Sequence, residues 1–151
     1  MTQALLETKE IAKALIHRTD DDRYLILRSS QWEENPERSL KPDFAGGSLE
    51  PGESVENALI REIEEEAGLI LSPEGLKLFW KQESEHPAGF ILIRNIFYIA
   101  VSGDLEVKLS FEHDKFWWLT KDEINKQVED GLWRDPYPEI FREAEKQGLL
   151  V

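Results

Sequence analysis

Cysteine is absent from this 151-residue chain, so disulfides, thiolate metal ligands and a cysteine nucleophile are excluded. Long apolar runs are also absent: the longest, residues 90–101, is too short to cross a bilayer and contains Arg94 and Asn95. The segment Met1–Glu10 mixes polar and apolar residues and lacks the apolar region of a signal peptide. Together these absences predict a soluble, cytoplasmic protein without a membrane partner.

Positive charge is scarce, with 18 Lys and Arg residues against 31 Asp and Glu and a net charge of −13. Such a surface repels phosphate backbones, so nucleic-acid binding is not expected. A phosphorylated small molecule is compatible with this charge, because bound cations can reverse its sign locally. The length and the hydrophobic fraction of 40% are typical of a single folded domain over residues 1–151.

Strand and helix patterns alternate along the chain and predict an α/β or α+β fold. Two apolar runs joined by an aspartate-rich turn indicate a β-hairpin, and the polar segment 29–42 is predicted to be a long loop, which is often functional. The expected strands are 10–17, 23–28, 76–83, 90–101 and 115–119, and the expected helices are 54–67, 121–128 and 138–146.

The helix from Ser54 to about Ala67 carries a cluster of acidic residues. Its apolar residues share one side, and an adjoining face carries Glu62, Glu65 and Glu66. Like charges at this spacing destabilise a helix by roughly 0.2–0.5 kcal/mol per pair. A divalent cation converts this repulsion into coordination, so the cluster has the composition of a Mg²⁺ or Mn²⁺ phosphate site. Taken alone, a solvated acidic face is the alternative interpretation.

The glycine-rich segment before this helix extends the pattern. Its fixed positions are Gly47, Glu53, Arg61, Glu62, Ile63, Glu65, Glu66, Gly68 and Leu69. At all of them the segment Gly47–Leu69 resembles the signature of the Nudix hydrolase family. The resemblance implies a Nudix-type α/β/α sandwich with a mixed β-sheet, and a MutT-like pyrophosphohydrolase that depends on Mg²⁺ or Mn²⁺.

The resemblance also implies roles for the residues of the signature. The helix glutamates would bind the metal, and the carbonyl of Gly46, just before the signature glycine, would be a further ligand. Arg61 and Glu53 would support the junction of loop and helix beside Gly47. The implied metal ligands within this segment are therefore Gly46, Glu62, Glu65 and Glu66.

Many members of the family add a carboxylate from a later loop, and Glu112 in FEHDKFWWL is the expected counterpart, as a metal ligand or general base. An ordinary loop glutamate is the alternative reading of Glu112, and His113 and Asp114 are weaker choices for the role. Either Glu62 or Glu112 would accept the proton of the attacking water. The expected catalytic set is thus Glu62, Glu65, Glu66 and Glu112.

Substrate contacts are expected from aromatic and basic residues outside the signature. These are Trp32, Phe44 and Trp133 for a base, and Arg28, Arg38 and Lys41 for outer phosphates. The implied substrate is a nucleoside triphosphate or a related nucleoside diphosphate compound, with clean-up of modified nucleotides as one version. A non-catalytic nucleotide-binding sensor on the same fold is the alternative function. The resemblance further implies a homodimer.

Overall fold

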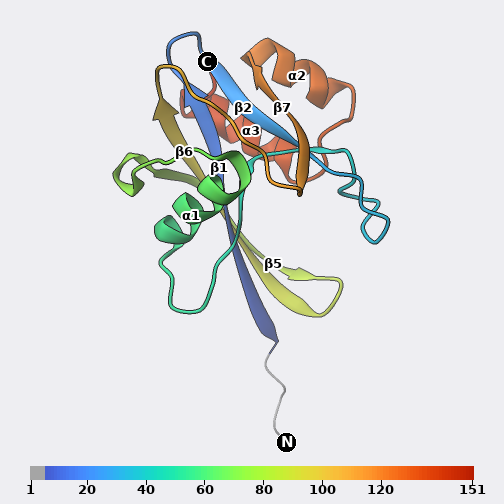
Figure 1. Cartoon of the computed structure of the whole chain (residues 1–151). Coiled ribbons are helices and arrows are strands. Elements are labelled where there is room, and N and C mark those ends of the chain that lie inside the picture. Colours follow the sequence, from blue (N-terminus) through green and yellow to red (C-terminus); the bar gives the residue numbers. More distant parts are fainter. Residues whose placement is uncertain (1–5) are drawn as a thin grey trace, which may run out of the picture.

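The computed structural model describes residues 6–151 and contains a seven-stranded sheet and three α-helices (Figure 1). The strands are β1 (Glu7–Arg18), β2 (Arg23–Ser29), β3 (Pro42–Asp43), β4 (Ala45–Ser48), β5 (Lys77–His86), β6 (Phe90–Val101) and β7 (His113–Leu119). The helices are α1 (Val55–Ala67), a short 3₁₀ helix (Pro73–Gly75), α2 (Lys121–Glu129) and α3 (Tyr137–Lys146). The expectation about Met1–Glu10 falls in part on residues 1–5, which lie outside the described residues.

The sheet is mixed, with strand order β3-β2-β1-β6-β5, while β4 pairs with β1 and β7 pairs with β2. β1 runs parallel to β6 from the Glu7–Phe90 pair to the Arg18–Val101 pair. The other strand pairs of the described residues are antiparallel. β1 starts at Glu7, three residues before the strand start expected from the apolar pattern. The backbone pairing with β6 continues through these first, polar residues of the strand. The arrangement confirms the predicted α+β class.

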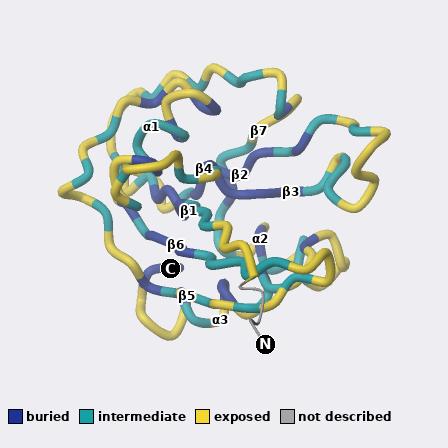
Figure 2. The backbone as a smooth tube through the Cα atoms, turned by 90° about the horizontal axis from the view of Figure 1, so that it is seen from below, coloured by how far each residue is buried: buried dark blue, intermediate teal, exposed yellow. Residues whose placement is uncertain are grey.

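Two hydrophobic layers fill the two faces of the sheet, and β1 contributes to both because its side chains alternate. Ala12 and Ile16 belong to the layer that holds α1, whereas Leu15 belongs to the layer that holds α2 and α3. Figure 2 shows α1 on one side of β1 and β6 and α3 on the other. The predicted α/β/α sandwich is therefore confirmed.

Across residues 6–151, no helix is both long enough and apolar enough to span a bilayer.

Candidate active site

Helix α1 begins and ends where its sequence predicts. The side chain of Ser54 caps the helix by accepting a hydrogen bond from the Asn57 N–H. Gly68 ends it at a φ of 70°, a left-handed conformation that suits glycine. Leu59 and Ile63 are fully buried against the sheet, so the orientation of the helix is set by its apolar side. The glutamates of the adjoining face are thereby directed toward β4 and the loop that precedes β7.

Gly46 and Gly47 of β4 allow two unusually close approaches. Gly46 has a φ of 143°, and a Cβ there would lie 2.6 Å from the Cα of Lys13 in β1. A Cβ on Gly47 would lie 2.6 Å from the carboxylate of Glu62. The first glycine lets two strands pack at this point, and the second leaves space for a carboxylate against the strand.

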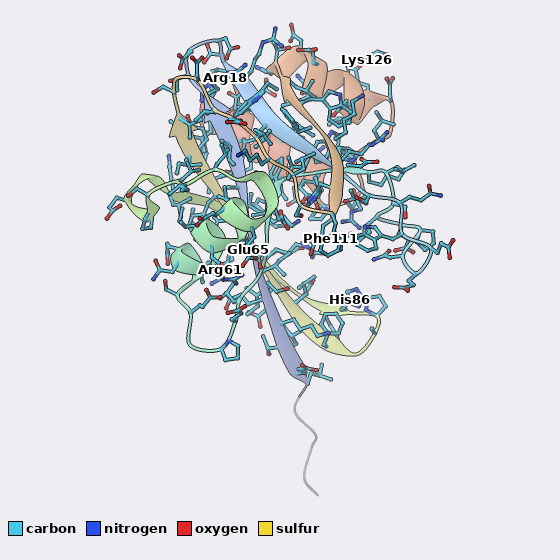
Figure 3. The ribbon with its side chains drawn as sticks, viewed as in Figure 1. Arg18, Arg61, Glu65, His86, Phe111 and Lys126 are labelled. Carbon is cyan, nitrogen blue, oxygen red and sulfur yellow. The ribbon has the colours of Figure 1, made fainter. Side chains whose placement is uncertain are left out.

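Arg61 joins the loop before α1 to the glutamates on the helix. Its Nε and Nη2 bond the two carboxylate oxygens of Glu53 at 2.8 and 2.7 Å, and Nη2 also bonds the Ser48 carbonyl at 3.1 Å. Its Nη1 bonds Glu62 at 3.1 Å and Glu65 at 3.2 Å. Figure 3 shows Arg61 and Glu65 together on α1. The Arg61 bonds lower the pKa of Glu53 to about 2, so this brace is charged at neutral pH.

Glu66 is buried, although the two other glutamates on its helix face, Glu62 and Glu65, are partly or fully accessible. Its Oε2 accepts a hydrogen bond from the Gly46 N–H at 3.0 Å, which joins α1 to β4. Burial raises the pKa of Glu66 to about 7, against the opposing charge of Lys13. The carboxylate is therefore held in place but lacks enough nearby positive charge to be fully ionised at neutral pH.

Glu62 and Glu112 lie near one another, although they come from α1 and from the loop before β7. Burial raises the pKa of Glu62, and the negative charges of Glu65 and Glu112 contribute to the same shift. The backbone of Glu112 is fixed, because its carbonyl accepts a hydrogen bond from the Ser30 N–H at 2.9 Å. The fold thus places Glu62 close enough to Glu65, Glu66 and Glu112 for the charges of these carboxylates to affect one another.

No group of three histidine or acidic side chains within residues 6–151 is already arranged to hold a metal ion. The donor chemistry nevertheless fits a divalent cation of the Mg²⁺ type, which prefers oxygen ligands and retains several waters. Two of the carboxylates, Glu62 and Glu66, have a raised pKa that added positive charge would lower. The absence of a Cβ at Gly47 leaves the Glu62 carboxylate room beside the strand.

Two of the predicted substrate contacts are wrong. Phe44 is fully buried and Trp133 is 4% exposed, and their rings pack edge to face with a centroid separation of 5.7 Å. Both belong to the hydrophobic layer that holds α3, so neither side chain reaches a surface that a substrate could contact. That a residue is aromatic does not by itself show whether its side chain lies in the core or in a binding pocket.

The other sequence candidates divide into available and engaged side chains. Arg28 forms a two-point ion pair with Asp114, with both N–O distances at 2.9 Å. His113 and Asp114 were the alternatives to Glu112. His113 is buried, and Asp114 is occupied by its ion pair with Arg28. Trp32 is half-buried and its ring meets the edge of Phe111 at 6.2 Å.

Sequence reasoning missed Lys13, Asp43 and Phe111. The Lys13 ammonium bonds the buried Asp43 carboxylate at 2.8 Å and lies close enough to Glu66 to lower its pKa. Phe111 is 80% exposed and directly precedes Glu112. The adjacency of Phe111 to Glu112 was readable from the sequence, whereas the Lys13–Asp43 pair depends on a contact between distant strands.

The buried His113 predicts a pH dependence of stability. Both ring nitrogens are buried without a hydrogen-bond partner, and burial lowers the pKa to about 4. An unfolded chain protonates this histidine near pH 6.5, so its contribution to the free energy of unfolding should fall as the pH drops from about 6.5 to about 4. Glu66 has a raised pKa and contributes in the opposite direction, so the test compares two proteins. In urea unfolding of the metal-free proteins at several pH values, His113→Gln should gain stability relative to the wild type as the pH falls through this range. Parallel curves for the two proteins would contradict the assignment.

Comparisons with known proteins agree with this geometry. The family model described as "NUDIX domain" matches residues 9–141. An 8-oxo-dGTP diphosphatase of Escherichia coli (strain K12) is 32% identical over 52% of this chain and 56% of its own length. An ADP-ribose pyrophosphatase of Methanocaldococcus jannaschii is 30% identical over 63% of each chain. The matches thus span less than two thirds of either curated relative.

A solved structure supports the fold independently. The MutT protein from Methanosarcina mazei Go1 superposes with a TM-score of 0.77, at 21% identity, over 97% of this chain and 99% of that one. At this identity the likeness concerns the fold alone. It extends the agreement from the matched sequence segments to nearly the whole chain.

Proposed function

Since this chain belongs to the NUDIX family, whose model it matches over residues 9–141, we propose that it hydrolyses a pyrophosphate bond in a nucleoside diphosphate derivative with the help of Mg²⁺ or Mn²⁺. The observation that carries the proposal is the intact signature folded as a unit. Its Glu66 is anchored to Gly46, its Glu62 lies against Gly47, and Arg61 ties the helix to Glu53. A solvated acidic face would require none of these contacts.

The cation would be held by Glu62, Glu65, Glu66 and the Gly46 carbonyl. When bound, it neutralises phosphate charge and lowers the pKa of the attacking water. Glu66 fixes the position of the ligand set through β4, and Arg61 orients Glu62 and Glu65. In the described part of the chain no side chain pairs with the Glu112 carboxylate, so we assign the role of general base to Glu112 rather than to Glu62.

The names of the relatives support a substrate class. One is described as an 8-oxo-dGTP diphosphatase and the other as an ADP-ribose pyrophosphatase, and both names refer to diphosphate linkages of a nucleoside. We propose that this chain acts on the same class, a nucleoside triphosphate or a nucleoside diphosphate joined to another group. Trp32 and Phe111, beside Glu112, are the aromatic residues best placed to contact such a substrate.

Metal dependence and substrate class can be tested together. The purified protein is incubated with nucleoside triphosphates, 8-oxo-dGTP, ADP-ribose, nucleotide sugars and dinucleoside polyphosphates, and the products are separated by chromatography. We expect turnover of at least one compound with Mg²⁺ or Mn²⁺, loss of turnover in excess EDTA, and recovery when the metal is restored. Tight binding of one compound without any turnover would contradict the enzyme and favour the non-catalytic sensor.

A further inference from the structure

A pocket of about 630 Å³ lies on the face of the sheet that carries α3, and basic side chains from four segments line it. They are Lys13 of β1, Arg38 of the 30–41 loop, Arg94 of β6 and Arg134 before α3. Glu37 and Asp135 are the acidic residues of the lining, and His86 stands at the end of β5 (Figure 3). Four basic side chains gathered in one pocket are unexpected in a chain whose net charge is −13.

The three arginines form no ion pairs in the part of the chain that the structure describes. Among the described residues, none of Arg38, Arg94 and Arg134 has an acidic oxygen within 4.0 Å, although the chain holds many ion pairs elsewhere. Arg94 donates to the amide oxygen of Gln82 at 3.0 Å. The Nε of Arg38 is buried and has no hydrogen-bond partner. The buried Nε of Arg38 is costly to leave without a partner, and an anion in the pocket would complete its bonds. Arg134 is exposed, so its guanidinium group is accessible to the same ligand.

Arg94 and Arg134 also lie close enough to affect one another. Burial lowers the pKa of Arg94, and the charge of Arg134 lowers it further. Two guanidinium groups that repel each other inside a pocket gain most from a ligand that places negative charge between them. Phosphate suits this arrangement, because the planar guanidinium fork bonds two of its oxygens at once.

The pocket is connected to the acidic site through Lys13. This residue lines the pocket, bonds Asp43 at 2.8 Å, and lies close enough to Glu66 to lower its pKa. The carboxylates and the arginines therefore adjoin the same strand, β1.

We propose that this cationic pocket, formed by Lys13, Arg38, Arg94 and Arg134, binds a second phosphate group of the substrate, in addition to the pyrophosphate that is cut. The inference rests on the proposed function and narrows it. A protein with such a pocket should bind nucleoside diphosphate compounds that carry an additional phosphate more tightly than compounds that lack it. The extra phosphate can belong to the polyphosphate chain or to a sugar ester, and the chemistry of recognition is the same.

The test uses pairs of compounds that differ by one phosphate. ADP-ribose is compared with its 2′-phosphate and ADP with adenosine 3′-phosphate 5′-diphosphate, for an ester phosphate. ADP is compared with ATP for a phosphate in the chain. Dissociation constants are measured by calorimetry in EDTA, so the readout does not require turnover. Charge-assisted bonds of this type predict about ten- to hundredfold tighter binding of the more phosphorylated member of at least one pair.

Variants assign the preference to the pocket. Arg94→Gln and Arg134→Gln should each reduce the preference to less than about threefold, with little change for the member that lacks the phosphate. Arg94→Lys should retain part of it, because the charge remains. Arg23→Gln is the matched control, since Arg23 pairs with Asp21 and Glu123 outside the pocket. Melting temperatures verify that each variant folds.

The outcomes separate this inference from the proposed function. Equal affinity for both members of every pair would overturn the inference, even if the protein hydrolyses pyrophosphate bonds. An equal loss of affinity for both members in the two glutamine variants would also overturn it. A phosphate preference that depends on Arg94 and Arg134, without any turnover, would support the pocket while refuting the enzyme.

Discussion

Replacing Glu66 by glutamine is expected to lower kcat by about 10²–10³-fold, because it removes a negative charge that holds the metal. The fold should stay intact, because glutamine has nearly the same size and shape as glutamate. The side chain is buried and accepts a hydrogen bond from Gly46, and an amide oxygen can accept the same bond. Glu65→Gln should have a similar effect on turnover, with a smaller effect on stability because its side chain is 57% exposed.

The measurement is steady-state turnover at saturating Mg²⁺, with a thermal unfolding curve for each protein. Glu64→Gln is the matched control, because this glutamate is exposed on the same helix and its side chain forms no hydrogen bond or ion pair among the described residues. It should behave like the wild type. Wild-type turnover in Glu65→Gln or Glu66→Gln would contradict the assignment of the site.

Gly46→Ala is expected to destabilise the protein by about 3 kcal/mol or more, because it combines backbone strain with a collision against another strand. A Cβ at this φ of 143° would lie 2.6 Å from the Cα of Lys13, and neither backbone can move without breaking the pairing of β1 with β4. For a chain of this length the melting temperature should fall by about 10 °C.

Gly47→Ala provides the contrast, since the two glycines are adjacent and the added methyl group is the same. Its φ lies outside the left-handed region, and the new Cβ would meet a side chain, the Glu62 carboxylate, rather than backbone. Glu62 can rotate away, so the melting temperature should change little while turnover falls. Equal loss of stability in the two variants would show that the close approach of Gly46 to β1 is not the decisive contact.

The sequence predicted the local features of the site well, because they depend on residues close together in the chain. The cap at Ser54, the end at Gly68 and the shared face of Glu62 and Glu65 all follow from spacing along one helix. The Arg61–Glu53 pair spans only the loop and the first turns of that helix.

The substrate side of the site could not be predicted in the same way, because it depends on which strands become neighbours. Phe44 lies two residues from the glycine pair, yet its ring turns to the opposite layer from α1. Arg94 interrupts an apolar run, which in the sequence indicates only that the run cannot cross a membrane. Its place beside Arg134 becomes visible once β6 is set against the segment before α3.

The parallel pairing of β1 with β6 has a consequence for how the protein acquires its activity during synthesis. Glu7 of β1 pairs with Phe90 of β6, and Gly46 of β4 pairs with Lys13 of β1. The sheet against which helix α1 packs is therefore incomplete until β6 has left the ribosome. Contacts between such distant segments form slowly and expose apolar surface while they are incomplete. A nascent chain that ends just after Leu69 would therefore carry every residue of the signature and still be unable to assemble the acidic site.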